Sequence, residues 1–295
     1  MLLLVCFFAG VLARRTRALP EDSHRAVNAW VMFVSLPALV FRSIHGVRLD
    51  PAMLLSSASF WLIFLVPAAV ALLLVRRGES KAHLGALALC SGLGNTAFVG
   101  LPLMEAIAGK EALGPAAVVD QLGSFLALFL FAIPFAAHLS PVPQERGPRL
   151  RSLKAPALIA LALAVLLTDV AVPQAIADVI NRLADMLSPL ALASVGWQLN
   201  LSALKGNGKS IAVGLTWKLF VAPARVLGLM MLLRGQLGFV GKVVVAQAAM
   251  APMVTAGVVA ADHRLAPELA SALIAVGIPL SLVTVPFWWH VMGFL

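Results

Sequence analysis

The chain has 295 residues, of which 61% are hydrophobic and 12% are charged, and its mean hydropathy is +0.97. These values exclude an ordinary soluble domain and favour a helical protein that crosses a membrane several times. A formal net charge of +9 would suggest nucleic acid as the partner of a soluble protein. In a membrane protein it is typical of charges that anchor cytoplasmic loops, so we expect a lipid bilayer and no nucleic acid.

Ten apolar segments follow one another along the chain. They lie at roughly 1–13, 26–45, 53–75, 83–107, 115–138, 155–170, 176–200, 209–233, 239–261 and 268–292. The first is short for a span of about 20 residues, so either this helix is tilted or half-inserted or, as we favour, the chain start lies inside a longer first helix. Two cysteines, Cys6 and Cys90, lie in such segments, and nothing argues for a disulfide between them.

The longest polar connector, residues 140–154, divides the ten segments into five and five. An odd number of spans per half gives the halves opposite orientation. The predicted fold class is therefore an all-α polytopic membrane protein with ten transmembrane helices in two inverted five-helix repeats. The repeats are residues 1–139 and 155–295, joined by a cytoplasmic connector.

Positive charge fixes the predicted orientation. With both termini outside, the inner loops hold fourteen basic residues: Arg14, Arg15, Arg17, Arg25, Arg76, Arg77, Lys81, Arg146, Arg149, Arg151, Lys154, Lys205, Lys209 and Arg264. The outer loops hold four: Arg48, Lys110, Arg234 and Lys242. Since cytoplasmic loops carry the excess of Lys and Arg, the central connector is expected in the cytoplasm.

Spans 4 and 9 contain residues that a lipid-facing helix does not need. Span 4 holds glycine, asparagine and proline within Gly92–Pro102, and span 9 is interrupted within Met250–Gly257. Freed backbone groups must face protein or water, and paired broken helices mark the binding sites of secondary transporters. Trp61–Ala68 and Trp217–Ala224 share Trp, Phe, Pro and Ala at one spacing, which favours an internal duplication.

Nearly the whole chain resembles the auxin efflux carrier family, which includes plant PIN-type exporters and bacterial carriers of organic acids. The matching stretches are Leu36–Phe41, Gly94–Leu103, Val119–Gln121, Gln247–Pro252, Leu269–Ser271 and Leu280–Pro286. The resemblance implies a fold akin to the sodium–bile acid symporters, with a scaffold from spans 1, 2, 6 and 7 that often dimerises. Spans 3–5 and 8–10 would form an elevator-like transport domain in which helices 4 and 9 cross. The expected location is a bacterial inner membrane.

Seven residues are predicted to bind substrate: Asn95, Thr96, Gly100, Pro102, Gln247, Pro252 and Thr255. A half-helix starting near Gly100–Pro102 would direct free N–H groups at an anion. In the family, the asparagine that matches Asn95 contacts substrate. The alternative is that Asn95 only forms hydrogen bonds with the backbone groups freed by the break in its own helix. The prolines shape the site. Gln247 and Thr255 have equally ordinary structural alternatives, an interhelical hydrogen bond and bonding within the helix.

Five further residues are candidates for ion coupling or a charge relay: Asp120, Gln121, Lys218, Arg225 and Asp185. Asp120 is expected near the outer surface, where it either binds H⁺ or Na⁺ or only complements a helix dipole. Lys218 and Arg225 lie inside span 8 at a cost of about 2.5–3.5 kcal/mol each unless paired. An ion pair of Arg225 with Asp185 is plausible. Lys218 either attracts an anionic substrate or reaches toward the inner surface.

The predicted function is secondary transport of a small organic anion, such as malate, malonate or an auxin-like aryl-acetate. We expect no cofactor. Transport could be coupled to H⁺ or to Na⁺, but few buried acidic residues are expected at the crossing, which disfavours Na⁺ coupling. The alternatives are a Na⁺-coupled symporter on the same fold and a sensor or scaffold that does not transport. No nucleophile elbow, phosphate loop or zinc spacing is present, so an enzyme is not expected. The histidines do not cluster at metal-binding spacing, so no metal site is predicted.

Overall fold

In the part of the chain that the structure describes, the long apolar runs form five helical units that are long and apolar enough to cross a membrane, Ser23–Ile44, Met53–Arg76, Lys110–Leu139, Gly208–Leu232 and Pro267–Phe294. The computed structural model describes residues 2–17, 20, 23–46, 51–141, 156–198, 207–234 and 237–294. Within these ranges the ordered elements are all helices, apart from one isolated β-bridge. Most of the predicted connector lies outside the described residues.

The long units are built of the following elements. They are α2 (Ser23–Trp30), η1 (Val31–Ser35) and α3 (Leu36–Ile44); α4 (Pro51–Arg76); η3 (Lys110–Ala112), α7 (Leu113–Val118), η4 (Val119–Phe125), η5 (Leu128–Ala132) and α8 (Ile133–Leu139); α12 (Gly208–Thr216), η8 (Trp217–Val221) and α13 (Ala222–Arg234); and α16 (Pro267–Val291) with η9 (Met292–Phe294).

The other predicted spans consist of shorter helices. They are α1 (Leu2–Thr16), α5 (Lys81–Gly92), η2 (Thr96–Gly100), α6 (Leu101–Ala108), α9 (Pro156–Leu166), α10 (Gln174–Asp185), α11 (Leu187–Gln198), α14 (Phe239–Ala248) and α15 (Val254–Asp262).

Proline explains most of the π-helical segments. The segments η1, η2, η5 and η8 each end two residues before a proline, namely Pro37, Pro102, Pro134 and Pro223. A proline lacks the N–H that would bond the carbonyl four residues earlier, and its ring clashes with that carbonyl. Widening the helix in the preceding turn relieves the clash without ending the helix.

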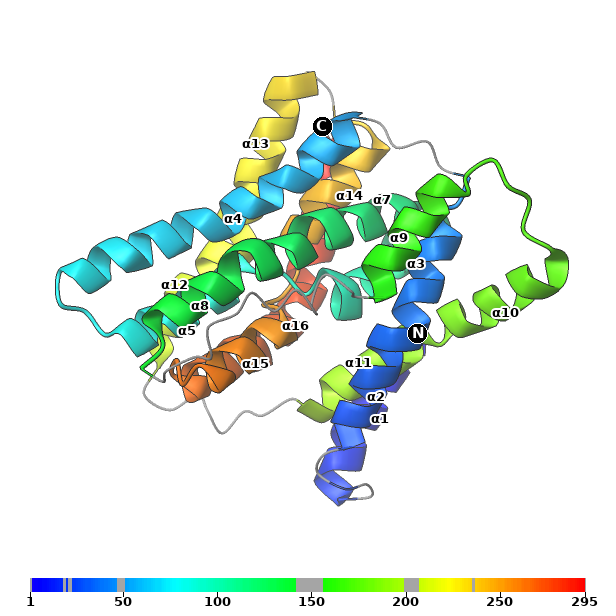
Figure 1. The fold of residues 1–295 in the computed structure, drawn as a ribbon. Helices are drawn as coiled ribbons and strands as arrows, with labels where there is room; N and C mark the ends of the chain where they lie inside the picture. Colours follow the sequence, from blue (N-terminus) through cyan, green and yellow to red (C-terminus); the bar gives the residue numbers. More distant parts are fainter. Residues whose placement is uncertain are drawn as a thin grey trace.

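Two groups of helices can be distinguished in Figure 1. In one, α1 packs along α11, and α3 packs along α9 and α10. In the other, α4, α5 and α8 pack with α12 to α16 around the centre of the molecule. Glycine allows the closest approach in the first group, because a Cβ atom on Gly10 would lie 2.0 Å from the Ala193 carbonyl oxygen.

Span 7 differs from the sequence prediction, because it is broken at Met186 into α10 and α11. Pro189 cannot donate to the carbonyl of Asp185, which is the last residue of α10. Helix α10 is also more polar than a spanning segment and is largely exposed. The predicted continuous helix over 176–200 was therefore wrong.

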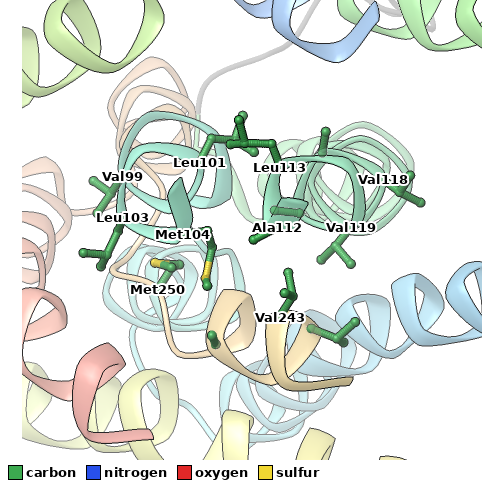
Figure 2. Close-up of a cluster of buried hydrophobic side chains, with 14 of the residues drawn as sticks. Val99, Leu101, Leu103, Met104, Ala112, Leu113, Val118, Val119, Val243 and Met250 are labelled. Atoms are coloured by element: carbon green, nitrogen blue, oxygen red, sulfur yellow. The ribbon is translucent and has the colours of Figure 1, made fainter. Parts of the chain in front are cut away.

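The buried apolar side chains of the described residues form two clusters, one of which includes Val99, Met104 and Val243. Figure 2 shows Val99, Leu103 and Met104 on one side of this cluster and Val243 on another, with Met104 and Met250 directed into the same space. These side chains are at most 8% exposed, so the polar groups described next are enclosed by hydrocarbon.

Candidate functional site: the crossing of two broken helices

The interruptions predicted in spans 4 and 9 are present, and they lie against each other. Gly94 and Pro252 form an antiparallel β-bridge. The Asn95 N–H donates to the Ala251 carbonyl at 2.7 Å, and the Met253 N–H donates to the Leu93 carbonyl at 3.0 Å. Each break therefore satisfies backbone groups that the other one frees, as buried backbone requires.

The second half of span 4 begins earlier than predicted. Segment η2 starts at Thr96, so Gly100 and Pro102 lie inside the helix and not at its N-terminus. The reason is the side chain of Asn95, whose Oδ1 accepts from the Phe98 N–H at 3.2 Å and caps the helix there. Pro102 acts on the shape of this helix, by widening the turn before it.

Asn95 is only 2% exposed, and of the two polar atoms of its amide only the oxygen forms a hydrogen bond. While Oδ1 caps η2, the Nδ2 atom is buried and has no hydrogen-bond partner. An unpaired buried donor costs about 1–3 kcal/mol. This donor lies on the residue whose backbone N–H bridges the two breaks.

Asp120 is buried at the crossing, and the expectation that it lies near the outer surface was wrong. Its Oδ1 accepts from the Thr96 hydroxyl at 2.5 Å, and its Oδ2 accepts from Gln121 Nε2 at 2.6 Å. Asp120 is 3% exposed, and Thr96 and Gln121 are fully buried. The inference that few acidic groups occupy the crossing is corrected by this carboxyl.

Gln247 of α14 joins the same region. Its Nε2 makes long hydrogen bonds to the carbonyls of Thr96, at 3.4 Å, and Ala116, at 3.5 Å. Its Oε1 is buried without a partner, as is Oε1 of Gln121. Gly100 leaves space for the Gln247 side chain, since a Cβ at position 100 would lie 2.3 Å from Gln247 Oε1.

Lys218 enters the crossing from η8. It is fully buried, and its Nζ donates to the Ala248 carbonyl at 2.8 Å. Ala248 ends α14, so the ammonium group lies at the negative end of that half-helix. A Cβ on Gly94 would lie 2.9 Å from Nζ, which shows how closely the lysine approaches the first break. The alternative that Lys218 reaches the inner surface does not hold.

Three predicted residues lie outside this cluster. Asp185 pairs with Arg42 at 2.6 Å and not with Arg225, so the expected ion pair was wrong. The tertiary structure determines the partner of Asp185, because the break at Met186 allows α10 to pack against α3, where Arg42 lies. Arg225 lies over the ring of Trp217. Thr255 is half-buried in the first turn of α15.

Ser124 was missed by the sequence analysis. Its hydroxyl is buried without a partner in η4, the same segment as Asp120. The signal was available, since residues three or four apart share a helix face, and Ser124 follows Gln121 by three positions and Asp120 by four.

The crossing presents both kinds of charge to a ligand. The N-terminal ends of η2 and α15, the Asn95 amide and the Lys218 ammonium suit an anion. The Asp120 carboxyl and the free oxygens of Gln121 and Gln247 suit a proton or a cation. Broken helices that meet in an apolar surround are the arrangement at which secondary transporters bind substrate and coupling ions.

These features define a helical membrane transport protein. The family model described as "Membrane transport protein" matches residues 1–289, and the chain belongs to that family. This confirms the resemblance to the auxin efflux carriers, drawn chiefly from the span 4 motif.

Two relatives are similar over nearly their full length. An uncharacterised transporter of Methanothermobacter thermautotrophicus is 25% identical over 97% of this chain and 94% of its own length. An uncharacterised transporter of Methanocaldococcus jannaschii is 23% identical over 99% of this chain and 97% of its own.

Proposed function

We propose that this protein is a secondary transporter of small organic anions, which bind where the two broken helices cross. The observation that carries the proposal is the buried, unpartnered Nδ2 of Asn95 beside the backbone bridge. A carboxylate placed there would accept from Asn95 and would benefit from the positive helix ends and from Lys218.

The substrate class follows from the size of the donor set. One amide and one ammonium group match a single carboxylate, and the side chains around the crossing are apolar, as an apolar substrate body would require. Aryl-acetates and other monocarboxylates are therefore the substrates to try first, followed by dicarboxylates such as malate or malonate.

An elevator-like movement is part of the proposal. Ten spans in two inverted repeats would place α4 to α8 and α12 to α16 in the transport domain, and α1 to α3 and α9 to α11 in the scaffold. The close packing of α1 with α11, and of α3 with α9 and α10, supports this division. The scaffold would form a homodimer in a bacterial inner membrane, for which the exposed apolar residues Ile159, Leu163 and Leu166 of α9 offer a surface.

Transport into proteoliposomes tests the function. We would measure currents for a panel of small carboxylates, with and without Na⁺ and with a pH step, for the wild type and Asn95→Ala. Asn181→Ala is the matched control, since Asn181 is exposed on α10. We expect carboxylate-dependent currents that persist without Na⁺, fall at least tenfold in Asn95→Ala and are unchanged in the control.

Two results would contradict this proposal. Binding of a carboxylate without any current would favour a sensor. Equal currents in Asn95→Ala and the wild type would place the substrate elsewhere.

A Na⁺-coupled symporter on the same fold is the second candidate, favoured by the buried carboxyl of Asp120 and the free Oε1 atoms of Gln121 and Gln247. Sodium prefers such oxygen ligands. This candidate predicts transport that requires Na⁺ and that loses its Na⁺ dependence in Asp120→Asn.

A further inference from the structure

Arg225 carries a charge on the outside of η8–α13, and it has no carboxylate partner among the residues that the structure describes. Its side chain is exposed. Its guanidinium carbon lies 5.5 Å from the centre of the Trp217 ring. The indole Nε1 of Trp217 is itself buried without a hydrogen-bond partner. Two unused donors therefore lie close together.

These donors border a groove of about 300 Å³ between α4 and η8–α13. The rest of its lining is mainly apolar and includes Leu62, Ile63 and Leu229. Its volume is at the small end of ligand pockets, which range over about 300–1,000 Å³. A groove with apolar walls and two donors at one place is chemically complementary to an amphipathic anion.

The depth of the groove limits what reaches it. Helical side chains point toward the N-terminus, and Arg225 accordingly contacts Trp217, eight residues earlier. Its charge thus lies near the middle of the unit Gly208–Leu232, and Leu62 and Ile63 lie near the middle of Met53–Arg76. The phosphate of a phospholipid lies at the bilayer surface, about 15 Å from the midplane, and its two chains exceed this groove.

We propose that the groove is a second anion site, which binds a single-chain amphipathic carboxylic acid. The Arg225 guanidinium pairs with the carboxylate, and the Trp217 N–H donates to it. The hydrocarbon chain lies against the leucine and isoleucine side chains of α4 and α13. This site is separate from the crossing, where Asn95 and Lys218 supply the donors, and it goes beyond the proposed function.

Binding of bromodecanoate to the protein in zwitterionic nanodiscs tests the site, with quenching of tryptophan fluorescence as the readout. We would compare the wild type with Arg225→Gln, and with Gly228→Leu, which fills the groove. A Cβ on Gly228 meets no atom within 4 Å, so this variant is expected to fold. Arg42→Gln is the matched control, because Arg42 pairs with Asp185 on another face.

The expected result is saturable quenching that is at least tenfold weaker in Arg225→Gln and in Gly228→Leu and unchanged in Arg42→Gln. Asn95→Ala should also bind normally, so a failure at the crossing does not affect this test. Wild-type binding in both groove variants would overturn the proposal. Equal quenching by bromodecanol would show an ordinary lipid-facing fissure and would overturn the proposal. Arg225-dependent quenching by brominated phospholipid would assign the site to lipid and would also overturn it.

Discussion

Asn95 divides one amide group between two tasks. Its oxygen caps the half-helix that begins at Thr96, and its nitrogen remains unpaired in the core. The cap belongs to the oxygen, and the proposed substrate contact would belong to the nitrogen, so the two roles are separable by mutation.

Asn95→Asp keeps an oxygen for the cap but removes the free donor and adds a negative charge. We expect carboxylate transport to fall at least tenfold, and the buried charge to lower the free energy of unfolding by more than about 1 kcal/mol. Proteoliposome currents and thermal unfolding in detergent measure the two effects. Full transport in folded Asn95→Asp would remove the donor from the mechanism.

Gly94 is required by the approach of Lys218 to the break. In Gly94→Ala the new Cβ would lie 2.9 Å from Nζ and 3.3 Å from Cε, so the lysine must move. We expect a loss of about 1–3 kcal/mol, measured by thermal unfolding. In a Lys218→Ala background the same change should cost much less, because the clashing atoms are gone. Equal losses in the two backgrounds would show that another contact restricts position 94.

At the scale of the elements, proline and tryptophan act together. Pro223 frees the carbonyl of Leu219, four residues earlier, and Trp288 of α16 donates its Nε1–H to that carbonyl at 2.8 Å. In α4, Trp61 donates in the same way to the Leu122 carbonyl of η4 at 2.9 Å. These indoles tie π-helical turns to the long helices that flank the crossing.

Trp288→Phe keeps the ring packing and leaves the Leu219 carbonyl buried and unpaired. We expect a loss of about 1–3 kcal/mol in stability. Adding Pro223→Ala supplies a backbone N–H for that carbonyl, so the double variant should recover part of the loss. Thermal unfolding of the four proteins gives the coupling, and strict additivity would contradict this account.

The breaks themselves were predictable, and the end points of the helices were not. Glycine, asparagine and proline in an apolar run require an interruption. Whether the next half-helix begins at Thr96 or near Gly100 depends on the local cap that Asn95 makes with the Phe98 N–H, because the glycine and the proline further on offer a competing start. The same holds for span 7, where Pro189 ends one helix, although Pro67 lies inside α4 without ending it.

For the whole molecule, the charge pattern predicts an orientation that labelling tests. In a background without Cys6 and Cys90, Glu79→Cys lies in the turn between α4 and α5, and Lys110→Cys lies after α6; both positions are exposed. With both termini outside, an impermeant maleimide should label Lys110→Cys in intact cells and label Glu79→Cys only after the membrane is opened. The reverse pattern would show the opposite orientation.

The sequence by itself determined the class of protein and the position of the two helix breaks. Apolar runs, basic loops and two interrupted segments are local properties, because each depends on what hydrocarbon accepts at that point in the chain. Only the tertiary structure decided which groups meet. It brought Asp120 and Lys218 to the crossing and paired Asp185 with Arg42, because partner choice depends on distances between helices that are remote in the sequence.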